Sequence, residues 1–438
     1  MSKAKTANQK LSLKDCVSIG MGMTVGAGVI TLTGIVIGLT GTGVSLAYII
    51  SALIFLIGII PLIIVGTTIP RQSASYTYCK ELISPKAGGM YMMIFLIGRI
   101  TMALFGISFA QYLSSLFPGI NPTAVGIAMI TFFYIVNFFG LKSAKTVQNI
   151  MFIILVIALL SFVIIGIPKI CVDFFNPDLM FSGGFTGMAL SSAMLIFSLA
   201  GGVILLDFGP LVEKPEKNIP KSIIIVTLTA SILFALVGAV GAGVLPLSEV
   251  AGKPLTFAAE HIYPTKALFG FFILGGALLA LTTTANSSFM WYCNALIKGC
   301  EDEWFPKKLA VKNKYGVPYY LLTLFYIMGI LPILLKIDIT TMSKLSTALT
   351  MLIMILPILS FIKLPKKYPE EWKHSKFYIK SNKVVKLITI FCFALLTVDV
   401  LFIFMSFPKK TLLLTLAAIV GSFIYVMIVG NKLEKKVR

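Results

Sequence analysis

The sequence has 438 residues, of which 58% are hydrophobic and only 12% are charged. This composition excludes an ordinary soluble domain and predicts an all-α integral membrane protein. The net charge of +20 does not indicate a nucleic-acid partner, because the basic residues stand in blocks between apolar runs, as loops beside a lipid bilayer do. The six cysteines have no Cys-x-x-Cys spacing, so we predict no disulfide framework, metal site or cofactor.

Apolar runs bounded by charged residues, proline or glycine predict twelve membrane-spanning helices. In chain order they cover approximately residues 15–38, 43–66, 89–116, 123–140, 146–167, 186–209, 221–245, 266–297, 318–335, 342–362, 384–407 and 411–430. The N-terminus is basic and runs into the first span without an obvious small-residue cleavage site. We therefore expect a retained first helix and not a cleaved leader.

The distribution of Lys and Arg predicts the orientation. With a cytoplasmic N-terminus, 29 of the 37 Lys and Arg residues fall in cytoplasmic segments and seven in external loops, while Arg99 lies inside the third span. This asymmetry predicts a multi-pass protein with both termini in the cytoplasm. The low external charge favours a prokaryotic plasma membrane. The basic stretch 363–386, which contains Trp372, is expected to be a solvated cytoplasmic loop held at the lipid headgroups.

Glycines interrupt the first span at positions 20, 22, 26, 28, 34 and 38, although each costs roughly 1 kcal/mol relative to alanine inside a helix. A similar interruption, FSLAGGV, occupies residues 197–203 in the sixth span. Close packing of small residues between membrane helices is one explanation. Paired glycine-broken helices in corresponding halves of a chain also indicate a transporter's binding site near the middle of the membrane.

Unwound backbone inside a membrane needs partners for its N–H and C=O groups, and a bound zwitterion supplies both kinds. N–H groups at a half-helix start in the first span would receive a carboxylate, and carbonyls in the sixth would accept from an ammonium group. The predicted substrate-binding residues are Gly26, Ala27, Gly28, Val29, Ile30, Phe197, Ser198, Leu199, Ala200 and Gly201.

Four motifs carry a family resemblance. GAGVI at 26–30 is similar to a G-S/A-G-I/V motif, and GGMY at 88–91 to a GG-x-Y motif that opens a third helix. Residues 197–220 resemble a sixth helix followed by a V-x-x-P-x-x-N-I/V-P loop, and residues 294–318 resemble the loop after an eighth helix. In this order and spacing, essentially the whole chain resembles the amino acid-polyamine-organocation (APC) transporter superfamily.

The resemblance implies a LeuT-like fold of two inverted five-helix repeats, with broken helices 1 and 6 and two additional C-terminal helices. We expect no enzyme, because the sequence has no His-containing catalytic motif and no sizeable soluble domain. We expect a ten-helix core at 1–362, with repeats at about 15–167 and 186–362. The basic loop 363–383, two additional spans at 384–430 and a basic tail at 431–438 would follow.

By position, the resemblance assigns Ala27, Gly28 and Val29 to the substrate carboxylate, and Ser198, Leu199 and Ala200 to its amine. Phe197 falls where the family often has an aromatic gate, and ordinary helix packing is the other role for that ring. The sequence also departs from the pattern. Leu155 occupies the place of a lysine that some exchangers carry in helix 5, and residues 209–211 replace an acidic pair near the end of helix 6.

Asp207 and Arg99 are ionisable residues inside predicted spans, which makes them functional candidates. Both fall in the cytoplasmic half of their spans, so we expect them to pair, either as a fixed bridge or as part of an inner gate or proton relay. Asp399 lies outside the predicted core, where packing or an oligomer contact is expected. His261 and His374 fall in loops and are poor candidates for carrying protons across the membrane.

Hydroxyl and amide side chains are concentrated in the eighth span. They would form helix-to-helix hydrogen bonds or coordinate a cation such as sodium. These residues are Thr282, Thr283, Thr284, Asn286, Ser287 and Ser288. In the tenth span, Ser346, Thr347 and Thr350 are expected to line the cavity by the same reasoning.

These features predict a secondary active transporter of neutral amino acids, coupled to protons or working by exchange, with the lipid bilayer and a possible second copy as its partners. A cationic substrate would be expected to meet an acidic side chain at the broken segments, and the sequence has none there. Two alternatives stay open. One is an exchanger of cationic amino acids or polyamines, and the other is an amino-acid sensor built on the same fold.

Overall fold

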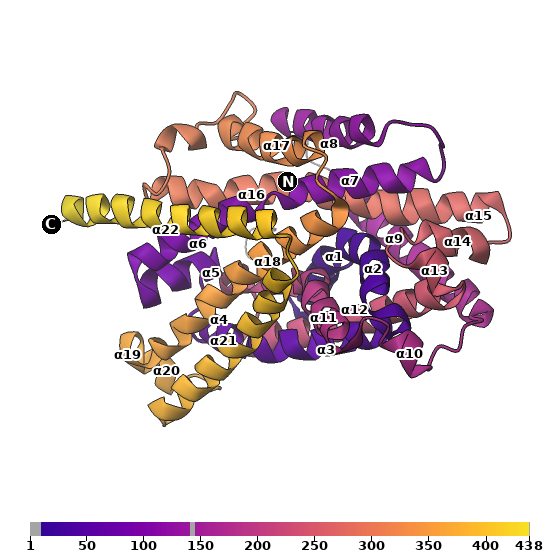
Figure 1. Ribbon diagram of the computed structural model, residues 1–438. Helices are drawn as coiled ribbons and strands as arrows, with labels where there is room; N and C mark the ends of the chain where they lie inside the picture. The colour runs from indigo at the N-terminus through magenta and orange to yellow at the C-terminus, as the bar shows by residue number, and fades with distance from the viewer. Residues whose placement is uncertain (1–9, 141–144, 438) are drawn as a thin grey trace, which may run out of the picture.

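The computed structural model describes residues 10–140 and 145–437, and helices dominate these ranges (Figure 1). Nine of the described helices are long and apolar enough to cross a membrane. The β pairing found in the same ranges consists of two isolated bridges, Leu11 with Val212 and Lys312 with Pro318. The predicted fold class, an all-α multi-pass membrane protein, is confirmed.

Helices occupy every predicted apolar run. In the first half of the chain they are α1 (Leu13–Thr24), α2 (Ala27–Thr40), α3 (Val44–Gly58), α4 (Ile60–Thr68), α6 (Pro85–Gly98), α7 (Thr101–Ser114), α8 (Pro122–Phe138) and α9 (Lys145–Gly166). In the second half they are α11 (Gly184–Leu199), η4 (Ala200–Leu206), α12 (Pro215–Gly243), α15 (Lys266–Phe271), η6 (Phe272–Leu278), α16 (Leu279–Glu301), α17 (Tyr319–Leu334), α18 (Ile339–Ile358), α21 (Asn382–Met405) and α22 (Lys409–Val437).

Short helices connect the long ones. They are η1 (Gly41–Gly43), α5 (Ala74–Tyr78), η2 (Cys79–Ile83), η3 (Ile167–Lys169), α10 (Pro177–Met180), η5 (Gly209–Leu211), α13 (Leu247–Val250), α14 (Thr256–Ile262), η7 (Lys307–Ala310), η8 (Leu359–Ile362), α19 (Leu364–Lys367) and α20 (Pro369–Lys373). The helices α8 and α17 are shorter than a typical span, although both are apolar.

Polar caps fix several helix starts at the ends of the apolar runs. The first helix begins with a capping box, in which the Ser12 N–H donates to the Asp15 carboxylate at 2.9 Å and the Asp15 N–H donates to the Ser12 hydroxyl at 3.3 Å. Ser84 caps α6 directly before Pro85, and Asp338 caps α18. Each cap supplies an acceptor for N–H groups that the helix leaves without a partner.

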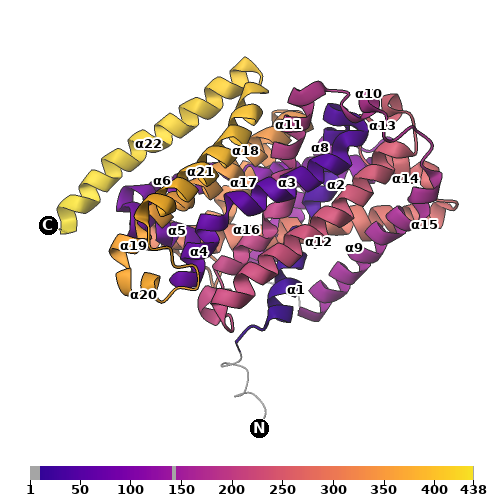
Figure 2. The same cartoon turned by 90° about the horizontal axis from the view of Figure 1, so that it is seen from below.

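The helices form two packed groups. In one, α3 packs on α11 and α12, and α1 packs on α12 and η4; in the other, α7 and α16 pack on α8 and α17. The helix α18 contacts α6, α7, α11 and α21 and so links the two groups. Both views show the C-terminal end of α22 projecting beyond the other helices (Figures 1 and 2).

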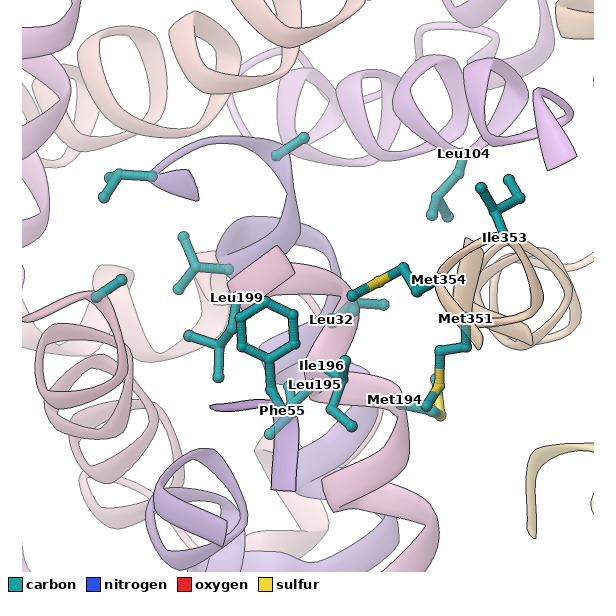
Figure 3. Packing of buried hydrophobic residues seen from close by; sticks show 14 of the residues in the cluster. Leu32, Phe55, Leu104, Met194, Leu195, Ile196, Leu199, Met351, Ile353 and Met354 are labelled. Atoms are coloured by element: carbon teal, nitrogen blue, oxygen red, sulfur yellow. The ribbon is translucent and has the colours of Figure 1, made fainter. Parts of the chain in front are cut away.

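Apolar side chains fill the space between α11, α18 and α7. Figure 3 shows Met351 of α18 beside Met194 of α11, and Ile353 of α18 pointing toward Leu104 of α7. All four side chains are buried. This packing fixes the position of the C-terminal end of α11, where the substrate-binding residues predicted for the sixth span begin.

Residues 363–381 differ from the solvated loop that we expected. Trp372 is only 3% exposed, and its ring centroid lies 5.6 Å from that of Phe361 and 5.7 Å from that of Tyr378. The Ser375 hydroxyl lies 2.8 Å from that of Thr68. The segment is docked on the helical core through the buried Trp372 ring, while its lysines stay exposed.

Replacing Trp372 with alanine is expected to release this segment, since removing a buried Trp side chain costs about 3–5 kcal/mol. Trypsin should then cleave after Lys373 and Lys376 faster than in the unaltered protein. Phe175→Ala, at a ring that is 78% exposed, is the matched aromatic control and should leave cleavage unchanged. Equal cleavage in both variants would show that Trp372 does not hold the segment in place.

Candidate functional site

The first predicted span is divided in its middle. The helix α1 ends at Thr24, and α2 starts at Ala27 after the N-cap Gly26, which has no side chain to cap the new helix. The N–H groups of the first turn of α2 therefore need partners from elsewhere. One of them, the Ala27 N–H, donates to the Thr284 hydroxyl of α16 at 3.3 Å. The break at Gly26 places a helix N-terminus, with its positive dipole end, inside the bundle.

The sixth span changes its helix type where we expected it to unwind. The α-helix α11 continues to Leu199 and then tightens into the 3₁₀ helix η4. The bonding between residues three apart in η4 starts at Leu199, whereas the Phe197 and Ser198 carbonyls belong to the last turn of α11, which leaves its carbonyls without an intrahelical partner. The glycines at 201 and 202 therefore lie in a 3₁₀ helix and not in the unwound segment that we expected.

Two glycines let these segments cross backbone to backbone. A Cβ atom on Gly28 would lie 2.9 Å from the Ser198 Cα atom, and one on Gly201 would lie 2.5 Å from the carbonyl carbon of Met23. Both distances are shorter than any side chain tolerates beside a backbone atom. The close-packing explanation for these glycines is therefore correct, and the packing occurs at the break itself.

A cavity of about 200 Å³ adjoins this crossing. Seven of the ten predicted substrate-binding residues line it, namely Gly26, Ala27, Gly28, Phe197, Ser198, Ala200 and Gly201. Val29, Ile30 and Leu199, for which the prediction concerns backbone groups, have side chains that are fully buried in the hydrophobic core. The reason is helical periodicity: α2 and α11 present only one side to the cavity, and the other side packs against neighbouring helices.

Arg99 and Asp207 both line the cavity, but the expected pair between them is not among the ion pairs of the described residues. The Arg99 Nε atom donates to the Phe95 carbonyl at 3.0 Å. The Asp207 Oδ1 atom accepts from the Ala74 N–H at 2.6 Å. Each charge is thus held by the backbone at a helix end, and the pairing hypothesis is wrong for this conformation.

Aromatic rings that we did not predict surround Arg99. The guanidinium carbon lies 4.2 Å from the ring centroid of Phe95, 4.7 Å from that of Tyr292 and 5.2 Å from that of Trp291. These three rings and Tyr91 line the cavity. Tyr91 and Phe95 are four residues apart on α6, a spacing that places both on one side of a helix and was a readable signal.

The third span also contains an interruption that we did not predict. The helix α6 ends at Gly98 and α7 starts at Thr101, so Arg99 stands between them. The Thr101 hydroxyl donates to the Gly98 carbonyl at 2.8 Å. The signal was weak, because a single glycine before an arginine resembles many intact helices.

The hydroxyl cluster of α16 divides into two sets. Thr284 and Ser288 line the cavity. Thr283 donates to the Leu279 carbonyl and Ser287 to the Thr283 carbonyl, each at 2.8 Å, while the Asn286 side chain accepts from that of Asn137 at 2.8 Å. Of the tenth-span hydroxyls, Thr350 lines the cavity. Within the described ranges, no group of three or more His, Cys, Asp or Glu side chains could hold a metal ion.

The loop α5–η2 borders one end of the cavity, which Ser75 lines. The adjacent Tyr76 hydroxyl donates to the Asp302 carboxylate. Asp302 also forms an ion pair with Lys80, whose Nζ atom lies 2.8 Å from Oδ2. Burial, and after it the neighbouring carboxylate of Asp302, raises the pKa of Tyr76 well above its usual value, so this hydroxyl stays protonated. The loop is therefore fixed to the start of the segment that follows α16.

The opposite end of the bundle is closed by the segment between α13 and α14. The Gly252 N–H donates to the Gly34 carbonyl at 3.0 Å, and the Leu255 N–H donates to the Tyr112 hydroxyl at 3.1 Å. Tyr112 in turn donates to the Ile30 carbonyl at 2.9 Å. The cavity that remains beneath this segment has about 10 Å³, which is room for at most one water molecule.

Comparison with known proteins identifies similar chains. A family model described as amino acid permease matches residues 11–430. The branched-chain amino acid permease BcaP of Bacillus subtilis is 24% identical over 403 residues, which cover 84% of this chain and 83% of the permease. The methylthioribose transporter of the same organism is 27% identical over 310 residues, 64% of this chain and 65% of the transporter. An uncharacterized protein of Methanocaldococcus jannaschii is 24% identical over 321 residues, 71% of this chain and 74% of that protein.

Gly201→Ala is expected to force α1 away from η4, because the added Cβ would meet the backbone of Met23 and Thr24. Such overpacking costs about 1–3 kcal/mol and should lower the melting temperature in detergent by several degrees. Gly421→Ala in α22 is the matched control, since nothing lies within 4 Å of its added Cβ. That control should keep or slightly raise the melting temperature. Identical melting of the two variants would contradict the crossing.

Proposed function

The chain belongs to the amino acid permease family, as its four motifs predicted, and from this premise we propose that it moves amino acids across the plasma membrane by alternating access. This family is one of transporters and not of enzymes. The observation that carries the proposal is the cavity beside the α1–α2 break, where the start of α2 and the end of α11 meet. A central site between two discontinuous helices is the arrangement that secondary transporters use.

For the architecture we propose twelve spans, with two inverted five-helix repeats at about 15–167 and 186–362 and the two additional spans at 384–430. In support, helices at corresponding places in the two halves pack as pairs: α2 with α11, α3 with α12, α7 with α16, and α8 with α17. The Lys and Arg distribution supports cytoplasmic termini. The closed segment between α13 and α14 would then face outward, and the loop α5–η2 inward.

The substrate site that we propose binds a zwitterion. Its carboxylate is received by the N–H groups at the start of α2, near Gly26, Ala27 and Gly28, where the helix dipole favours an anion. Its ammonium group donates to carbonyls at the junction of α11 and η4. The Phe197 ring covers the bound substrate as a gate. The cavity volume of about 200 Å³ supports a ligand of amino-acid size, since drug-sized pockets run from roughly 300 to 1,000 Å³.

The start of α2 and the junction of α11 and η4 bind only the α-carboxylate and the ammonium group of the substrate. Taken without other residues of the cavity, they favour amino acids with a neutral side chain. A cationic amino acid or polyamine is the weaker alternative, because Arg99 places a positive charge in the cavity wall and Asp207 is already bonded to Ala74. The relatives bear names as different as a branched-chain amino acid permease and a methylthioribose transporter, so family membership does not select among amino acids. A sensor on this fold would bind the same ligands and move none of them.

For coupling we propose proton symport or exchange. Leu155 occupies the place of the helix-5 lysine of some exchangers, so the chain does not carry that fixed cation. Asp207 links the cavity to the segment α5–η2, which we call the gate loop, because its carboxylate accepts a hydrogen bond from the Ala74 N–H. A proton on Asp207 would remove the charge that strengthens this bond and so loosen the loop. This arrangement ties protonation to opening of the cavity toward the cytoplasm.

Uptake of radiolabelled amino acids into liposomes that contain the purified protein tests the transport proposal. Each compound is offered with an inward proton gradient, with an inward sodium gradient, and with unlabelled substrate inside alone. We expect accumulation that follows the proton gradient or requires only internal substrate. Ligands that shift the melting temperature without accumulating under any condition would replace the transporter with the sensor.

Asp207→Asn is expected to reduce proton-driven uptake about tenfold or more, because the amide cannot take up the proton. Exchange of labelled for unlabelled substrate should persist. Asp399→Asn is the matched control, as this carboxylate is 6% exposed in α21 and lies away from the cavity. If Asp207→Asn keeps the full pH dependence of uptake, the relay role of Asp207 is wrong.

A further inference from the structure

Arg99 is a buried cation in the cavity wall, with no acidic partner among the described ion pairs. Its residue is only 4% exposed, and its fixed contacts are the Phe95 carbonyl and three aromatic rings. A buried charge without a counter-charge is costly and, within a membrane span, usually serves a ligand. The Phe95 carbonyl takes the Nε donor and the Tyr292 hydroxyl accepts from the guanidinium, which carries further N–H donors at its two terminal nitrogens.

The surroundings of Arg99 suit an anion. The rings of Phe95, Trp291 and Tyr292 hold the guanidinium in one place and keep water from its faces. An arginine fixed in this way binds a carboxylate strongly, because its planar fork matches two oxygens. The other charge of the cavity, Asp207, is bonded to the Ala74 N–H and forms no ion pair with Arg99 in the described structure.

The same cavity contains a second place for an anion at the start of α2, which Gly26, Ala27 and Gly28 line. An amino acid with a neutral side chain has one carboxylate and would leave Arg99 buried and uncompensated. An amino acid with an acidic side chain has two carboxylates, one for each position. The number of anion positions in the cavity therefore exceeds what a neutral substrate supplies.

We propose that Arg99 binds the side-chain carboxylate of an anionic amino acid, while the start of α2 binds its α-carboxylate. This inference rests on the proposed transport function and replaces its neutral substrate with an acidic amino acid, such as aspartate or glutamate. Arg99 is then a specificity-determining residue, and the aromatic rings around it position the guanidinium for the side chain.

Isosteric ligand pairs test the inference on the full-length protein in detergent. Aspartate with asparagine, and glutamate with glutamine, differ in side-chain charge and hardly in shape. Binding is followed by tryptophan fluorescence, since Trp291 lies 5.2 Å from the guanidinium, and is repeated by calorimetry. We expect the unaltered protein to bind each acidic ligand at least about tenfold more tightly than its amide, as charge-assisted hydrogen bonds do.

Arg99→Gln should remove this preference, weakening the acidic ligands about 10- to 100-fold and leaving the amides within about threefold. Arg99→Lys, which keeps the charge and loses the fork, should restore part of the preference. Arg71→Gln is the matched control: it removes one arginine charge from a side chain that is 40% exposed and lies outside the cavity lining. Its preference for the acidic ligands should equal that of the unaltered protein.

Three other results would contradict three different claims, namely the anionic substrate, the binding role of Arg99 and the transport function. Equal binding of acid and amide by the unaltered protein contradicts the anionic substrate and leaves neutral amino-acid transport standing, and this comparison needs no variant to fold. Equal loss of acid and amide in Arg99→Gln assigns Arg99 a purely structural role as a brace between α6 and α16. If no amino acid binds or is taken up by the unaltered protein, the proposed function fails, and this inference fails with it.

Discussion

The close crossing of two interrupted helices is the constraint on which the site depends. At Gly28 and Gly201 the backbones of α2 and η4 come so near to Ser198 and Met23 that a methyl group does not fit. Contact at this distance gives both segments a fixed partner. The membrane therefore tolerates a helix N-terminus in its interior at Gly26, because the surrounding backbone is buried in protein and not in lipid. The cavity lies where the break between α1 and α2 stands beside the junction of α11 and η4.

The sequence predicted the helices well because the membrane leaves few choices. An apolar run of about 20 residues has to satisfy its own backbone, so it becomes a helix whatever its neighbours are. The glycines at 26 and 28 located the break in the first span correctly. The sixth span was harder, since glycine lowers the cost both of unwinding and of tightening into a 3₁₀ helix, and only the packing of η4 against α1 decides between them.

A hydrophobic run shows how deep in the membrane a residue lies, but it does not show toward which side of the helix its side chain points. The prediction that Arg99 and Asp207 form a pair failed for this reason. Arg99 and Asp207 were expected to pair because they stand at a similar depth, yet each turns to a different helix end. Val29, Ile30 and Leu199 were predicted to contribute backbone groups, and their side chains turn into the core because consecutive helical residues point about 100° apart. The docked Trp372 was missed for a related reason: its lysine neighbours dominate the composition of that stretch, while a single buried ring decides where the stretch lies.

The two charges of the cavity follow one electrostatic rule. Arg99 stands at the C-terminal end of α6 and donates to one of its last carbonyls, where the helix dipole favours a cation. Asp207 accepts from Ala74 at the N-terminal end of α5, where N–H groups favour an anion. Because a backbone group at a helix end holds each side chain, the two charges are turned away from each other and neither neutralises the other. A charge held in this way keeps its remaining hydrogen-bonding capacity for a substrate or a proton, whereas a buried Arg99–Asp207 pair would have used that capacity within the protein.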